Sequence, residues 1–106
     1  MIRQTLPQTV AARLAAGERL TLLDVREDWE LAIAVLPGII HIPMGEIPDR
    51  WTELDASAPT VVICRSGMRS QQVAGFLRAQ GIAQVENLAG GILAWARELD
   101  PSLTAY

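Results

Sequence analysis

The single cysteine of this chain lies in a short stretch whose residue types suit nucleophilic chemistry on an anion. Cys64 is followed by small and basic residues, with arginine at positions 65 and 69 and glycine at position 67. A thiolate is the reactive form of cysteine, and it is stabilised beside positive charge and at a helix N-terminus. The stretch after the cysteine consists of Arg65, Ser66, Gly67, Met68, Arg69 and Ser70. We expect Cys64 to be the nucleophile and these residues to form the loop that binds an anionic substrate.

The elements on either side of this loop explain why it should bind anions. Residues 60–63 are β-branched throughout and predict a buried strand that ends at Cys64. A helix is predicted to follow the loop and to run to Gln80, with Gly81 as its stop and Met68 in its buried stripe. A loop between a strand and a helix N-terminus directs several backbone N–H groups to one place. The expected substrate is an anion with a sulfur or phosphorus centre.

Strand and helix patterns alternate along the rest of the chain. Strands are expected over 2–4, 20–25, 39–42, 60–63 and 85–88, and helices over 7–16, 28–33, 48–54, 68–80 and 92–99. Strands separated by helices require parallel crossovers. The sequence therefore predicts one α/β domain over residues 1–106, with a mostly parallel sheet of about five strands and helices on both faces.

Composition excludes several classes of protein. All nine basic residues among the 106 are arginine, which excludes lysine-dependent phosphate loops and Schiff-base enzymes. One cysteine and one histidine exclude internal disulfides and multi-cysteine metal sites, so we expect no metal and no cofactor. The net charge of −3 gives no support for nucleic-acid binding. No apolar stretch resembles a secretion signal or a membrane span, and we expect a cytoplasmic protein.

Taken together and in order, four segments resemble the single-domain rhodaneses, a family of thiosulfate sulfurtransferases. The resemblance covers nearly the whole chain and rests on residues 22–30, 36–43, 64–70 and 87–95. It implies a rhodanese-like domain in which Cys64 carries a persulfide. The implied donor is thiosulfate or another small anionic sulfur compound, and the implied acceptor is cyanide, a thiol or a sulfur-carrier protein. One departure is Ala34-Val35 before Leu36-Pro37-Gly38, where the family commonly has Gly-His.

Two further family positions, Asp24 and Arg26, are present in this chain. We favour an ion pair that fixes a loop beside the site over direct contact with substrate. Arg65 and Arg69 are harder to rank, and we expect Arg69, on the first helical turn, to be the more structural of the two.

Three alternatives remain open. A cysteine-based phosphatase or arsenate reductase shares the layout, but those enzymes have five residues between cysteine and arginine, whereas four separate Cys64 from Arg69. A Cys–His hydrolase would need His41 as its base, and we expect His41 instead to be partly buried and bonded to backbone. A persulfide relay module for a partner protein, with little thiosulfate turnover, would have the same sequence features.

Overall fold

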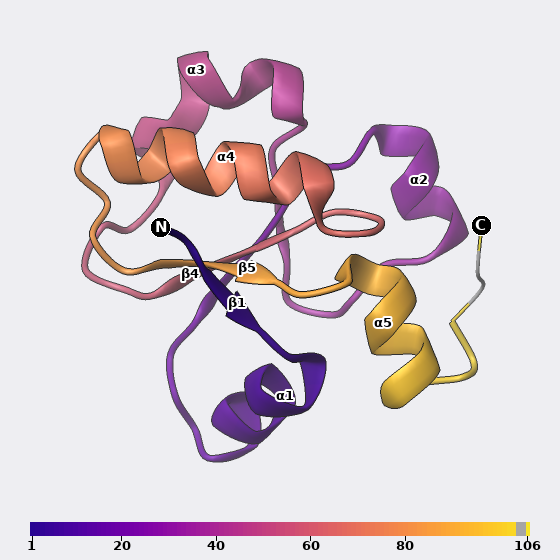
Figure 1. The fold of residues 1–106 in the computed structure, drawn as a ribbon. Helices are drawn as coiled ribbons and strands as arrows, with labels where there is room; N and C mark the ends of the chain where they lie inside the picture. The colour runs from indigo at the N-terminus through magenta and orange to yellow at the C-terminus, as the bar shows by residue number, and fades with distance from the viewer. Residues whose placement is uncertain (104–105) are drawn as a thin grey trace.

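Five short strands form a single parallel sheet in the computed structural model, which describes residues 1–103 and 106 (Figure 1). The strand order across the sheet is β1-β5-β4-β2-β3, and every neighbouring pair is parallel. The strands are β1 (Arg3–Thr5), β2 (Thr21–Asp24), β3 (Ile40–His41), β4 (Thr60–Ile63) and β5 (Val85–Leu88). The α/β fold with a parallel sheet that the sequence predicts is therefore confirmed.

Helices cover both faces of this sheet. α3 and α4 lie on one face, and α1 and α5 lie on the other (Figure 1). The helices are α1 (Pro7–Ala15), α2 (Asp28–Ile33), α3 (Ile47–Arg50), α4 (Met68–Ala79) and α5 (Gly91–Glu98). Among the residues described, no helix is both long enough and apolar enough to cross a membrane.

The segment predicted as one helix over 48–54 instead belongs to a series of three short helical turns over residues 44–53. A 3₁₀ turn over Met44–Glu46 leads into α3, and a second one over Trp51–Glu53 follows it. Pro48 occupies the first turn of α3, where its missing N–H has no helical partner to lose. The α-helical part therefore begins earlier than predicted and is only one turn long.

Two hydrophobic cores separate the sheet from its helices, because successive strand residues point to opposite faces. Leu23 and Val62 pack into the first core with residues of α3 and α4, and Leu22 and Val61 pack into the second with residues of α1 and α5. Met68 is an exception to the predicted stripe. As the first residue of α4 it is 75% exposed, so its assignment to the buried face is wrong.

The sheet register brings the polar loops together at one edge. Asp24 at the end of β2 is aligned with Ile63 at the end of β4, and Val62 is aligned with Asn87 in β5. Parallel strands present their carboxyl ends at the same edge, where ligands bind in open α/β sheets. The loop after Cys64 lies at this edge, between β2 and β5.

Candidate active site

Cys64 lies at the end of β4 with its sulfur between two hydrogen-bond donors. The residue is 1% exposed. The backbone N–H of Gly67 lies 3.0 Å from Cys64 Sγ, and the Ser70 hydroxyl oxygen lies 3.2 Å from it. Gly67 adopts a φ of +104°, which a residue with a side chain rarely adopts, and this backbone turn directs its N–H at the sulfur. Both donors stabilise negative charge on the sulfur.

The N-terminus of α5 supports the loop from behind. The N–H groups of Ile92 and Leu93 donate to the carbonyl oxygens of Cys64 and Arg65, at 2.9 and 3.1 Å. In a trans peptide the carbonyl and the next N–H point in opposite directions, so the loop amides that follow point away from α5. Gly91 permits this close approach, because a Cβ there would lie 2.4 Å from the Arg65 oxygen and 2.5 Å from the Cys64 oxygen.

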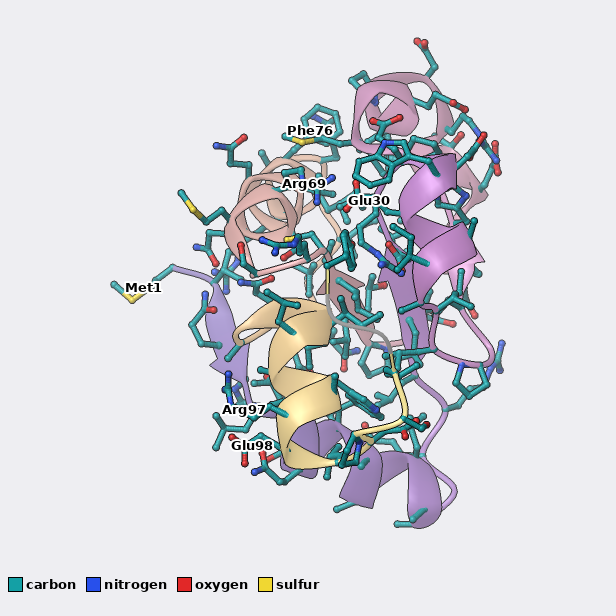
Figure 2. All side chains as sticks on the ribbon, turned by 90° about the vertical axis from the view of Figure 1, so that its right-hand side faces the viewer. Met1, Glu30, Arg69, Phe76, Arg97 and Glu98 are labelled. Atoms are coloured by element: carbon teal, nitrogen blue, oxygen red, sulfur yellow. The ribbon has the colours of Figure 1, made fainter. Side chains whose placement is uncertain are left out.

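Arg69 does not project freely into the loop but forms an ion pair with α2. Its two terminal nitrogens lie 2.6 and 2.8 Å from the carboxylate oxygens of Glu30. Both side chains are labelled in Figure 2. The Glu30 side chain is 2% exposed, and the hydrogen bonds from Arg69 lower the pKa of this carboxyl to about 2. The same pair raises the pKa of Arg69. This contact ties the first turn of α4 to α2.

Asp24 and Arg26 form an ion pair in the interior. Both side chains have no exposed surface, and Arg26 donates to the Asp24 carboxylate at 2.8 Å through Nη2. The same nitrogen also donates to the carbonyl of Ala34 at 2.8 Å. In this structure the pair therefore joins the end of β2 to the segment after α2.

Tyr106 crosses the outer side of the site and contacts both charged pairs. Arg26 Nη1 lies 2.8 Å from the Tyr106 hydroxyl, which in turn donates to Glu30 at 2.7 Å. The exposed Arg65 bonds the main-chain oxygen of Tyr106, and its guanidinium lies 5.2 Å from the centre of the Tyr106 ring. Burial raises the pKa of the Tyr106 phenol. Trp29 packs edge-on against the same ring, at 6.1 Å between centroids, although it is otherwise 62% exposed.

The other loop residues and His41 differ in how far they are exposed. Ser66 and Met68 are exposed on the loop and at the start of α4, and Ser70 is buried. His41 is partly buried, and its Nε2 lies 2.6 Å from the carbonyl oxygen of Arg26. It is therefore engaged with the backbone, as expected for a structural histidine.

Sequence reasoning missed four residues that build the site. Glu30 and Tyr106 carried no local signal, since their roles depend on contacts with distant segments. Asn87 was detectable as a polar residue in a buried strand, and it bonds both Ser70 and the carbonyl of Gly67. Gly91 is one of two adjacent glycines before the predicted helix over 92–99, and that pattern does not specify its close packing against the Cys64 loop.

Comparisons with known proteins agree on one family. The family model described as "Rhodanese-like domain" matches residues 6–98. A putative sulfurtransferase of Bacillus subtilis, YtwF, is 42% identical over 100 residues, which cover 94% of this chain and 96% of that protein. A sulfurtransferase of Allochromatium vinosum is 39% identical over 97 residues, covering 92% of this chain and 91% of that one.

A solved structure shows the same fold over nearly the full length. The rhodanese-like domain protein of Staphylococcus aureus superposes with a TM-score of 0.85 at 28% identity, covering 99% of each chain. The chain belongs to the rhodanese-like family, and the names of its relatives from Bacillus subtilis and Allochromatium vinosum indicate sulfurtransferases.

Proposed function

We propose that this chain transfers a sulfane sulfur from thiosulfate, or from a related anionic donor, to a thiophilic acceptor through a persulfide on Cys64. The observation that carries this proposal is the pair of donors on Cys64 Sγ, the Gly67 N–H at 3.0 Å and the Ser70 hydroxyl at 3.2 Å. These donors stabilise the Cys64 thiolate, which is the nucleophile of the first step and the leaving group of the second step, where charge develops again on Sγ.

The first step is attack of the Cys64 thiolate on the outer sulfur of thiosulfate. The new bond joins Cys64 Sγ to that sulfur, and the old S–S bond breaks with its electron pair leaving on sulfite. In the second step an acceptor such as cyanide attacks the outer sulfur. Thiocyanate leaves, and the electron pair of the broken bond restores the Cys64 thiolate.

Neither step moves a proton when both reactants are anions, so the site needs no general base. Arg65 is the cation we assign to the donor. Its side chain is exposed on the loop, where it contacts the main-chain oxygen and the ring of Tyr106, whereas Arg69 pairs with the buried carboxylate of Glu30. We therefore propose that Arg65 attracts the anionic donor and that Arg69 contributes by fixing the start of α4.

The acceptor in this proposal is a small thiol, cyanide or a sulfur-carrier protein. Cys64 has almost no exposed surface, so a protein acceptor would have to present its reactive group on an extended segment that enters the loop. Asp24 and Arg26 support the site from the interior, and we assign them no contact with substrate.

Steady-state kinetics with thiosulfate and cyanide test this proposal. A covalent intermediate predicts ping-pong kinetics, in which double-reciprocal plots against one substrate at several fixed concentrations of the other are parallel. It also predicts complete loss of thiocyanate formation in Cys64→Ser. Intersecting lines, or turnover that survives in Cys64→Ser, would contradict it. Slow turnover with thiosulfate and fast transfer from a protein persulfide would favour the relay role over thiosulfate turnover.

A further inference from the structure

Asn87 is a buried side chain that contacts both groups that donate to the Cys64 sulfur. It lies in β5, is 2% exposed, and forms hydrogen bonds within the protein through both its Nδ2 and its Oδ1. Its Nδ2 donates to the carbonyl oxygen of Gly67 at 3.0 Å and to Gln4 Oε1 at 2.9 Å. Its Oδ1 accepts from the Ser70 hydroxyl.

These contacts fix which way the Asn87 amide points. Both partners of Nδ2 are oxygen acceptors, one of them a main-chain carbonyl that has no proton to donate. A flipped amide would set Oδ1 against the Gly67 carbonyl oxygen, leaving two acceptors in contact. The oxygen of Asn87 therefore faces Ser70, and Ser70 is the donor in that hydrogen bond.

Ser70 has one proton and two acceptors within reach. Its hydroxyl oxygen bonds Asn87 Oδ1 and lies 3.2 Å from Cys64 Sγ. When Cys64 is a neutral thiol, its S–H donates to the Ser70 oxygen, and the Ser70 hydroxyl donates to Asn87 Oδ1. When Cys64 is a thiolate, a hydrogen bond to its sulfur is charge-assisted and about twice as strong as a neutral one. The Ser70 hydroxyl then donates to the sulfur in place of Asn87 Oδ1.

We infer that Asn87 is a positioning residue that holds the Ser70 hydroxyl between these two acceptors and so sets how strongly Ser70 stabilises a charged sulfur on Cys64. The same side chain binds the carbonyl of Gly67, the residue whose N–H is the other donor to that sulfur. The consequence for turnover rests on the proposed sulfur transfer, but the effect on the Cys64 thiolate does not.

Asn87→Asp tests the competition between the two acceptors. A carboxylate oxygen is a stronger acceptor than an amide oxygen, so it should keep the Ser70 proton away from the sulfur. Alkylation of Cys64 by iodoacetamide, followed by intact mass against pH, measures the thiolate fraction. We expect the midpoint of the profile to rise by about one pH unit, with about a tenfold lower rate at pH below the midpoint.

A double-mutant cycle separates the Ser70 effect from the added charge. In a Ser70→Ala background, Asn87→Asp should shift the midpoint by clearly less than in the wild type, because only direct repulsion and the lost Nδ2 bond to the Gly67 carbonyl remain. Gln4→Glu is the matched control. It adds a carboxylate on the other side of the Asn87 amide, and the midpoint should stay near that of the wild type. Equal shifts in both backgrounds, or no shift, would overturn the inference.

A measurement on the unsubstituted protein keeps the test independent of how well Asn87→Asp folds. The side-chain amide resonances of Asn87, followed by NMR against pH, should move with the same midpoint as Cys64 alkylation and should not move in Ser70→Ala. Asn87 amide chemical shifts that stay constant across the pH range of the Cys64 alkylation profile would overturn the inference. No sulfur donor is used, so a protein without thiosulfate turnover would still give a result, and failure here would leave the sulfur-transfer proposal standing.

Discussion

Removal of Arg69 should destabilise the protein through the carboxylate it leaves behind. Glu30 is 2% exposed and accepts two hydrogen bonds from Arg69, one from the Tyr106 hydroxyl and one from the N–H of Glu27. Arg69→Ala removes the only cation among these partners. The two neutral donors remain, so Glu30 keeps a partial hydrogen-bond shell but loses its charge partner.

The size of the effect follows from burial. Removing one partner of a fully buried ion pair costs about 3–5 kcal/mol. Here the Arg69 side chain is 34% exposed, so solvent already screens part of the interaction. We therefore expect a loss of about 2–3 kcal/mol in the free energy of unfolding at pH 7, or a fall of roughly 10–20 °C in Tm.

The loss should depend on pH in a defined direction. In the wild type the pKa of Glu30 is about 2, below its ordinary value of 4.5, so its contribution is complete above pH 5 and declines as the pH falls toward 2. Without Arg69, burial should raise the pKa of Glu30. The variant then takes up a proton on Glu30 at a higher pH, and its deficit should shrink between pH 5 and pH 3.

Urea unfolding of both proteins at pH 7 and at pH 3.5 measures this difference. The double variant Arg69→Ala with Glu30→Gln is the control, because it removes the unpaired charge and should recover part of the stability at pH 7. A deficit of equal size at both pH values would refute the assignment of Glu30 as the group responsible. A deficit below about 0.5 kcal/mol would show that the pair behaves as an ordinary surface contact.

Three further variants test the roles of Gly91, Arg65 and Tyr106. Gly91→Ala would place a Cβ 2.5 Å or less from the carbonyl oxygens of Cys64 and Arg65, so turnover should fall at least about tenfold. The control is Gly75→Ala, whose Cβ would lie in open space on α4 and should leave turnover unchanged. An undisturbed rate in Gly91→Ala would contradict the role of α5. Arg65→Ala should raise the KM for thiosulfate and lower the free energy of unfolding by no more than about 1 kcal/mol, because the exposed side chain loses only its contacts with Tyr106. An unchanged KM would remove Arg65 from donor binding. Tyr106→Phe should lower the free energy of unfolding by about 1 kcal/mol through loss of its two hydroxyl contacts, and a stability equal to wild type would show that those contacts contribute nothing.

The features that the sequence predicts well are the local ones. The β-branched run at 60–63, the cysteine after it and the glycine at 67 specify a strand, a loop and a helix start within ten residues. The alternation of strand and helix patterns was sufficient for the parallel α/β fold. Segment 44–53 was less predictable, because short 3₁₀ turns have no distinctive periodicity.

The contacts that complete the site join segments far apart in the chain. Arg69 and Glu30 are 39 residues apart, and Tyr106 and Glu30 are 76 apart. Their pairing depends on the way the sheet register brings the ends of β2 and β4 to one edge, which no single segment encodes. Asn87 is an intermediate case, since a polar residue in a buried strand predicts a buried partner without specifying which one.

The intact mass of the protein gives a direct test of sulfur transfer through Cys64. After incubation with thiosulfate and removal of the excess, we expect a gain of one sulfur atom in the wild type, none in Cys64→Ser, and loss of that sulfur as thiocyanate when cyanide is added. A wild-type mass that stays unchanged with both thiosulfate and a protein persulfide donor, or a gain that persists in Cys64→Ser, would show that Cys64 does not carry the sulfur.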